Sequence, residues 1–260
     1  IYALQGDSAD ADNAFEMLNE MMEVFENKFG PYIWEKIGYS AVDFNSGAME
    51  HVTNIAYPVY ALTTSLADQT LIAHELSHHW FGNQVTCSNA GDMWLNEGWA
   101  SYCEAIYVEA IHGDQSFHNY VKSNHNSVVN SAHNSDGGYW ALSGIPLDLT
   151  YSTTVYDKGA DVVHTLRNYM GDDNFFPAVQ SYLSTFSEND ASSEDLRDHL
   201  SSASGISLSD FFDTWVFNGG FPVSVDAVLR HTARSRTCIE RPAPSRAGYC
   251  TAQDKSLGSL

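Results

Sequence analysis

The sequence predicts a mainly helical α+β domain with a small mixed β-sheet ahead of its central helix. Most segments up to residue 222 carry apolar residues at helical spacing and have glycine or proline near their ends. Segments with the alternating pattern of a strand are few and short. At 260 residues the chain is also long enough to bury a substantial core.

The sheet and a helix that packs beside it are expected near the N-terminus. Residues 12–29 are predicted to form an amphipathic helix that ends at Gly30 and Pro31. Its apolar face consists of Phe15, Leu18, Met22, Phe25 and Phe29. Residues 36–44 partly alternate and are predicted to form a strand, after which 45–47 turn into 48–51. We therefore expect the sheet to precede the central helix.

Helices dominate the chain after residue 64. They are predicted at 65–81, 93–111, 113–129, 155–170, 173–186, 192–203 and 208–216. Ser192 and Asp195 have the spacing of a capping box at the start of one of them. Residues 130–149, which contain two adjacent glycines, are predicted to form the longest loop.

We predict that the domain ends near residue 222. Residues 221–228 begin a strand-like run, and the composition then shifts to Arg, Pro, Ser and Ala without any periodic pattern. We therefore expect residues 223–260 to hold the start of a strand and a poorly ordered tail. The chain begins with Ile1 and shows no leader of basic and then apolar residues, so we expect a mature product or a fragment.

The charge and the cysteine content limit which kinds of partner and which cellular compartment we expect. The net charge of −21 disfavours nucleic acid and anionic membranes as partners, and no apolar run is long enough to predict a membrane span. Cys87 and Cys103 flank one predicted helix start, and Cys238 and Cys250 lie together in the tail. For these four cysteines, the sequence is compatible with disulfides and with free thiols. The even count favours a secreted or periplasmic protein over a cytoplasmic one.

Two histidines and a glutamate have the spacing of a metal site. His74 and His78 are four residues apart on a predicted helix, so they share one face at about 5–6 Å between Cβ atoms. Glu97 follows His78 after eighteen residues, on a second predicted helix. Two His and one Glu form the open three-ligand set of catalytic zinc, with water in the fourth position. The sequence therefore predicts one zinc ion per chain.

Glu75 is the predicted general base. It lies beside His74 but about 100° round the helix, where its carboxylate can take a proton from that water. The His-Glu-x-x-His pattern at 74–78 alone arises by chance in on the order of one chain in a hundred of this length, usually on a solvated helix face. Chance does not predict Glu97 and its flanking residues at the matching distance, so we favour the metal site.

The residues HELSHHWFGN at 74–83 and WLNEG at 94–98 resemble the gluzincin aminopeptidases of the aminopeptidase N and leukotriene hydrolase family. The eighteen-residue gap is that family's spacing, and thermolysin-like endopeptidases run one residue longer. The resemblance implies a thermolysin-like zinc metallopeptidase catalytic domain over residues 1–222. Family members are usually longer, with a β-rich domain before the catalytic domain and helical domains after it.

A second resemblance concerns the substrate. Gly47, Ala48, Met49 and Glu50 match the first four positions of the family's Gly-x-Met-Glu-Asn motif, and His51 replaces the usual Asn. The resemblance implies that Glu50 binds the free α-amino group of a peptide, while the neighbouring backbone pairs with the peptide as an added strand. A carboxylate facing an ammonium makes a charge-assisted bond that a blocked N-terminus cannot make.

A third resemblance supplies the oxyanion donor. VYDKG at 155–159 matches the family's Tyr-x-Lys-Gly segment, which implies that the Tyr156 phenol donates to the oxyanion formed at the scissile carbonyl. Tyr151 is the nearest rival in the sequence.

Together these residues predict a zinc metallo-aminopeptidase that acts on peptides with a free N-terminus. Two alternatives stay open. An epoxide hydrolase of the leukotriene-processing type can use the same zinc and carboxylates, although a lipid substrate needs a deep apolar tunnel. A truncated relative can also be retained for binding without catalysis. The sequence makes no prediction about the oligomeric state.

Overall fold

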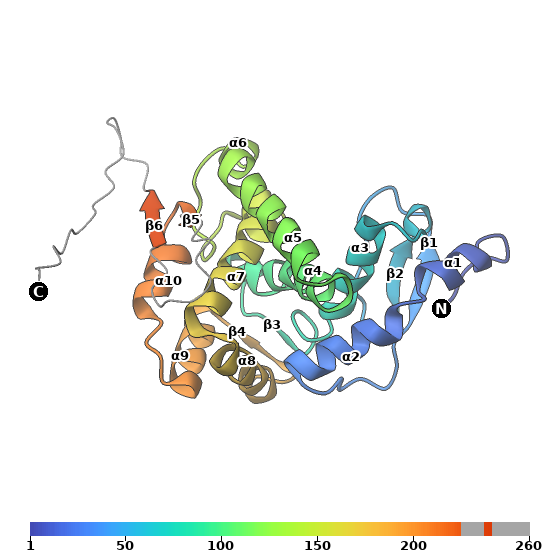
Figure 1. The fold of residues 1–260 in the computed structure, drawn as a ribbon, viewed down its shortest axis with the longest axis horizontal. Helices are drawn as coiled ribbons and strands as arrows, with labels where there is room; N and C mark the ends of the chain where they lie inside the picture. The colour runs from blue at the N-terminus through green and yellow to red at the C-terminus, as the bar shows by residue number, and fades with distance from the viewer. Residues whose placement is uncertain (225–236, 241–260) are drawn as a thin grey trace, which may run out of the picture.

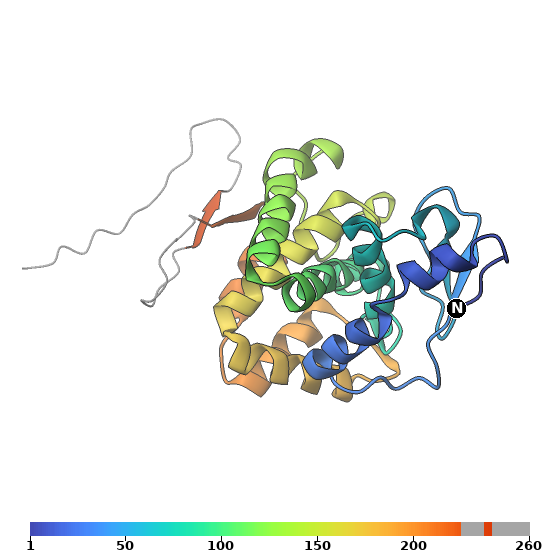
Figure 2. The ribbon, with the colours of Figure 1, turned by 45° about the vertical axis from the view of Figure 1, so that its right-hand side comes forward.

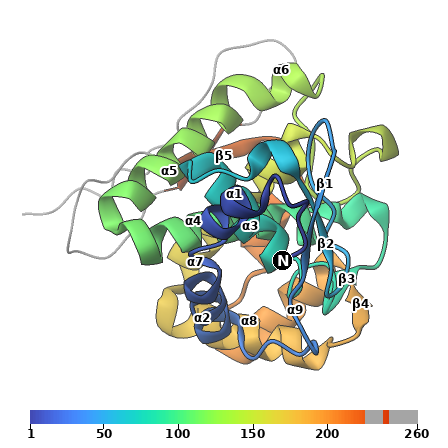
Figure 3. The same ribbon diagram turned by 90° about the vertical axis from the view of Figure 1, so that its right-hand side faces the viewer.

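In the computed structural model, which describes residues 1–224 and 237–240, the chain is mainly helical with small sheets, as predicted (Figure 1). The N-terminal helices and strands lie at one end of the molecule and the C-terminal helices at the other (Figures 1 and 2). Figure 3 looks onto the N-terminal end, where β1 and β2 run side by side. No helix in the described part of the chain is long and apolar enough to cross a bilayer.

The first helical segment is two helices rather than one. It forms α1 (Ser8–Ala14) and α2 (Leu18–Phe29), which are separated by residues 15–17. The break turns the Phe15 ring toward the sheet, where its centroid lies 4.6 Å from that of Tyr39 and 5.5 Å from that of Tyr57. The predicted continuous helix at 12–29 is therefore wrong, because packing on the sheet outweighs local helix propensity.

The sheet beside these helices is mixed, as predicted. β1 (Tyr39–Val42) is shorter than the predicted strand and pairs in parallel with β2 (Ile55–Pro58), a strand that was not predicted. Single bridges join Tyr2 to Ser40 in parallel and Met49 to Ala56 in the antiparallel sense. The segment containing Met49 therefore lies on the edge of the sheet. A 3₁₀ turn, η1 (Val59–Ala61), leads from β2 toward the central helix.

The two helices that carry the predicted metal ligands pack against each other. α3 (Leu66–Ser77) begins after Ser65, whose side chain accepts from the Asp68 N–H, and it ends four residues before the prediction. The second predicted helix begins as a 3₁₀ segment, η2 (Ala90–Leu95), and becomes α-helical only in α4 (Glu97–His112). Asn96 fixes this junction through bonds to the Cys87 N–H and the Thr86 hydroxyl.

The chain after α4 is more helical than predicted. α5 (Asp114–Ser127) continues through a π-helical segment, η3 (Val128–Ala132), into the short α6 (His133–Ser135). The first part of the predicted loop at 130–149 is thus helical. Asn130 and Asn134 each donate from their side chains to a carbonyl four residues earlier, so residues typical of loops support a helix here.

The remaining elements complete the domain. They are η4 (Leu147–Leu149), the π-helical η5 (Thr154–Lys158), α7 (Gly159–Met170), α8 (Asp172–Thr185), α9 (Ser193–Ser204) and α10 (Ser209–Trp215). The predicted capping box at Ser192 and Asp195 is confirmed. β3 (Val85–Cys87) pairs in parallel with β4 (Asn189–Ala191), which ties the segment after α3 to the C-terminal helices.

The tail contains one element that the sequence did not predict. β5 (Phe221–Ser224) pairs in the antiparallel sense with β6 (Thr237–Glu240). The rest of the predicted tail lies outside the described residues. The question of a Cys238–Cys250 disulfide also concerns residues and side chains outside the described part. Cys87 and Cys103 are free thiols, so they do not form a disulfide with each other.

Candidate metal centre

The three predicted ligands converge between α3 and α4. The Nε2 atoms of His74 and His78 each lie 3.3 Å from Oε2 of Glu97. All three residues are buried, and their ligand atoms lie within 4.8 Å of one another. The helical spacing of the histidines and the contact between the two helices thus assemble a two-nitrogen, one-oxygen donor set.

The electrostatics of this cluster favour a bound cation. Burial raises the pKa of the Glu97 carboxyl, but its bonds to His74 and His78 outweigh burial and hold the pKa well below the usual range. Burial lowers the pKa of His74, whereas its bonds to Glu104 and Glu97 raise it, with a net value of about 10. The carboxylates therefore stabilise a positive charge at the imidazoles, which a proton or a metal ion supplies.

Both imidazoles are oriented by their second ring nitrogen. His74 Nδ1 donates to Glu104 Oε1 at 2.8 Å, and His78 Nδ1 donates to the Phe81 carbonyl at 2.9 Å. These bonds fix the tautomers that turn Nε2 toward Glu97, as in most protein metal sites. Glu104 was not among the predicted site residues. The available signal was its position seven residues after Glu97, two turns along the same helix and therefore on the same face.

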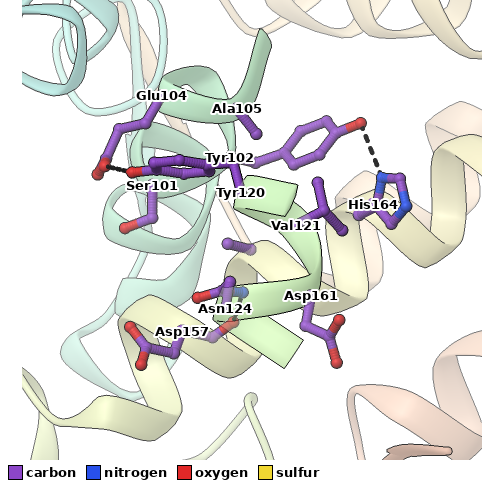
Figure 4. A pocket seen from close by; sticks show the side chains of 11 residues that line it. Ser101, Tyr102, Glu104, Ala105, Tyr120, Val121, Asn124, Asp157, Asp161 and His164 are labelled. Atoms are coloured by element: carbon purple, nitrogen blue, oxygen red, sulfur yellow. Dashed lines mark hydrogen bonds between the residues drawn. The ribbon is translucent and has the colours of Figure 1, made fainter. Parts of the chain in front are cut away.

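Glu104 connects the ligands to a cavity between α4, α5 and α7. Its other carboxylate oxygen accepts from the Tyr120 hydroxyl, and Figure 4 shows this bond beside the cavity. The cavity has a volume of about 110 Å³ and is lined partly by Asp157 and Asp161. Polar groups thus surround the outer side of Glu104.

Glu75 has a buried oxygen that lacks a partner. The residue is 5% exposed, and its Oε2 has no hydrogen-bond partner among the described residues. Burial raises the pKa of its carboxyl; His74 and His78 oppose this rise, and Glu50 adds to it. A buried polar atom without a partner is costly unless a bound group satisfies it. A metal-site water next to the three ligands fits this position.

Two glycines bring Tyr156 to the ligands. A Cβ on Gly98 would lie 2.8 Å from the Gly159 Cα, so α4 and α7 approach more closely than any side chain allows. This contact joins the residue after Glu97 to the turn that carries Tyr156. The Tyr156 ring stacks on His74 at 6.1 Å between centroids, whereas Tyr151 is 68% exposed. Burial, followed by the Glu97 carboxylate, raises the pKa of the Tyr156 phenol, which remains a proton donor.

The predicted substrate segment reaches the same site from the sheet. Met49 exchanges two backbone bonds with Ala56, and the Glu50 carbonyl accepts from the Asn83 side chain at 2.9 Å. The carboxylates of Glu50 and Glu75 lie within 4.8 Å of each other and of His78. His51, which replaces the family's Asn, is exposed, and its backbone closes the turn that follows. The structure thus brings Glu50, Glu75 and Tyr156 close to the three predicted ligands, while Gly47 and Ala48 lie next to Glu50 in the chain.

Comparison with known proteins agrees with this arrangement. A model described as the Peptidase family M1 domain matches residues 13–215. The chain belongs to peptidase family M1. The matched range contains both metal helices, Tyr156 and residues 47–53, which we call the Glu50 segment. The family resemblance noted in the sequence is therefore confirmed.

Relatives in family M1 are considerably longer than this chain. It is 30% identical over 252 residues to Aminopeptidase M1-B of Oryza sativa subsp. japonica, covering 86% of this chain and 27% of that protein. It is 31% identical over 247 residues to Aminopeptidase N of Lactococcus lactis subsp. lactis, covering 86% and 29% respectively. The chain therefore spans less than a third of these relatives.

Two solved structures share the fold. An M1 zinc metallopeptidase mutant from Deinococcus radiodurans, bound to a Tyr-Ser-Ala substrate, matches with a TM-score of 0.70 and 25% identity, over 79% of this chain and 45% of that one. Native yeast LTA4 hydrolase matches with a TM-score of 0.74 and 25% identity, over 82% of this chain and 36% of that one. The predicted catalytic-domain fold is thus confirmed.

Proposed function

We propose that this domain is the catalytic domain of a zinc aminopeptidase that hydrolyses the N-terminal peptide bond of peptides. One observation carries the proposal: the His74, His78 and Glu97 ligand atoms converge, and an unpartnered oxygen of Glu75 lies in the same buried cluster. The aminopeptidase relatives support the reaction class. The short span of the chain relative to those proteins makes direct assay of this chain the decisive step.

The donor set suits zinc. Two imidazole nitrogens and one carboxylate oxygen, with a fourth position open, are the usual ligands of catalytic zinc. When bound, zinc polarises the scissile carbonyl and lowers the pKa of a water molecule to about 7. In this proposal His74, His78 and Glu97 hold the ion, while Glu104 keeps His74 in the required tautomer.

Two residues move or donate protons in the proposed reaction. Glu75 accepts a proton from the attacking water and returns it to the leaving amine, a role supported by its burial and its raised pKa. Tyr156 donates a hydrogen bond to the oxyanion that develops on the carbonyl, a role supported by its contact with His74.

The finer part of the proposal is a preference for a free N-terminus. Glu50 lies within 4.8 Å of Glu75, so an ammonium bound to it sits close to the scissile carbonyl. Gly47 and Ala48 precede the bridged Met49 on the sheet edge, where their backbone is suited to pair with an extended peptide. The substrates proposed are peptides whose α-amino group is unblocked.

The alternatives from the sequence have less support. A leukotriene-type epoxide needs a deep apolar tunnel, whereas the cavity next to Glu104 is lined partly by carboxylates. A role in binding alone leaves no use for the buried oxygen of Glu75. The aminopeptidase reaction uses each residue of the cluster.

A panel of aminoacyl anilides, assayed with and without a chelator, tests the proposal. We expect hydrolysis that the chelator abolishes and added zinc restores. A chain that binds one zinc and hydrolyses no anilide would overturn it. Hydrolysis of a lipid epoxide instead would favour the epoxide hydrolase.

A further inference from the structure

Two side chains from the turn after α3 contact the Glu50 segment. Asn83 donates from Nδ2 to the Glu50 carbonyl at 2.9 Å, and His79 Nε2 accepts from the Thr53 N–H at 3.2 Å. Both residues follow the ligand His78 closely in the chain. Neither is among the three metal ligands, so both contacts serve the segment itself.

The Glu50 segment has little other support. Its pairing with the sheet is limited to the Met49–Ala56 bridge, and Gly47, Met49, His51 and Val52 are all exposed. The chain then turns back through residues 51–54, where the Asn54 N–H donates to the His51 carbonyl and the Asn54 side chain accepts from the Ser40 hydroxyl at 2.8 Å. A segment with few buried contacts opens at low cost, so side-chain bonds have a large share in fixing it.

Charge repulsion acts on the same segment. The Glu50 and Glu75 carboxylates lie within 4.8 Å of each other, and Glu75 is buried in α3. Two like charges at this distance in a partly buried site repel each other appreciably. The neutral Asn83 amide holds the Glu50 backbone without adding charge.

The contact of His79 with Thr53 is built on a buried framework. His79 is 1% exposed, and its Nδ1 donates to the Leu76 carbonyl at 3.2 Å, which leaves Nε2 free to accept. Thr53 has a φ of +63°, a conformation that β-branched residues rarely adopt. A Cβ on Gly38 would lie 2.5 Å from the Thr53 carbonyl oxygen, so the carbonyl side of this residue is also confined. Such a conformation persists only where its surroundings hold it.

We propose that Asn83 is a positioning residue that holds Glu50 at a fixed distance from the metal ligands, and that His79 holds the turn that follows it. The end of α3 then sets both the metal site and the site for the substrate's amine, so the ammonium and the scissile carbonyl are spaced by one rigid element. This inference rests on the proposed aminopeptidase function. It assigns no contact with substrate to either residue.

The test compares Asn83→Ala with Asn174→Ala. Asn174 also donates from Nδ2 to a backbone carbonyl at 2.9 Å, but its partner is Met170, the last residue of α7, at the junction where α8 begins. Each variant is assayed on an aminoacyl anilide and on its analogue without the amine. Asn83→Ala should lose about tenfold in kcat/KM on the free amine, mainly through KM, and change little on the analogue. Asn174→Ala should match the unaltered chain on both substrates.

A double-mutant cycle and hydrogen exchange separate positioning from general damage. Asn83→Ala should cost nothing further in a Glu50→Gln background, because Asn83 acts on the substrate only through the position of the Glu50 carboxylate, which that variant lacks. Backbone exchange at residues 51–54 should quicken in Asn83→Ala while the zinc content stays the same. An equal loss on both substrates, or full additivity with Glu50→Gln, would overturn the proposal.

Replacement of His79 gives a second readout. His79→Gln retains an oxygen that can accept from the Thr53 N–H, so it should keep the amine preference within about twofold, whereas His79→Leu should lose it. If the unaltered chain hydrolyses neither substrate, the proposed function fails. Exchange at residues 51–54 then decides the positioning alone: faster exchange in Asn83→Ala supports it, and unchanged exchange rejects it.

Discussion

The metal ligands and Glu50 lie in regions that are held together differently. His74, His78 and Glu97 belong to two packed helices, and each is less than 10% exposed. Glu50 is half-buried in a segment joined to the sheet by one bridge and to the turn after α3 by side-chain bonds. The chemistry thus depends on a rigid helical centre, and the proposed amine recognition on an edge fixed by long-range contacts. Changes in the two regions should therefore differ in size and in kind.

The largest effect is expected in the helical centre. Glu75→Gln removes the proton acceptor but keeps the shape of the side chain, so turnover should fall by about 10²–10⁴-fold. Zinc content, measured in the same preparation, should stay at the level of the unaltered chain because Glu75 is not a ligand. Normal turnover in the variant would remove Glu75 from the reaction.

Tyr156→Phe should have the next largest effect. Loss of one oxyanion donor lowers kcat by about 10²–10³-fold. Tyr151→Phe is the matched control, since Tyr151 is 68% exposed and does not stack on His74. Steady-state rates of the two variants decide the assignment: a silent Tyr156→Phe beside a crippled Tyr151→Phe would reverse it.

A change at the sheet edge should be smaller and confined to substrates with an amine. Glu50→Ala removes a charge-assisted bond worth about 1.5–3 kcal/mol, or roughly ten- to a hundredfold in kcat/KM. Acetylating the substrate should slow the unaltered chain by a similar factor and have little further effect on the variant. Rates on paired free and acetylated peptides measure this. Equal rates for the unaltered chain would indicate an endopeptidase.

The last effect concerns the folding stability of the helical region rather than catalysis. Burial lowers the pKa of Lys158 to about 7, while its Nζ donates to the Trp140 carbonyl. As the pH falls from about 10.5 to about 7, the unfolded chain binds a proton that the folded chain does not. The free energy of unfolding should therefore fall by up to about 1.4 kcal/mol for each pH unit between these two values. Below about pH 7 the contribution of Lys158 should no longer change with pH.

The variant Lys158→Met isolates the contribution of Lys158 to the pH dependence of stability. Its denaturation curves at pH 7.5 and 9.5 should differ less than those of the unaltered chain, because the other titrating groups are shared. The same pH dependence in both proteins would show that Lys158 is charged in the folded state.

The same contrast explains what the sequence could predict. The metal ligands follow from local spacing, because residues four apart on a helix share a face wherever the helix lies. The contact between Gly98 and Gly159, by contrast, joins segments far apart in the chain, and only the family resemblance pointed to Tyr156. The capping box at Ser192 could be predicted because its partner, Asp195, is only three residues away in the chain.

The errors arose where tertiary contacts prevail over local pattern. Phe15 leaves the predicted helix to pack on Tyr39, and β2 was missed because its strand pattern is only four residues long. Asn83 and His79 gave no local signal, since their partners lie in the separate segment at 50–53. Side-chain bonds over such distances become visible only in the folded chain.

The most direct test of the central claim is the metal content of the purified chain. Elemental analysis after dialysis at neutral pH should find one zinc per chain. His74→Ala, which leaves two of the three ligands, should retain little zinc and no hydrolytic activity. Absence of any transition metal from the unaltered chain, even after zinc is supplied, would contradict the account.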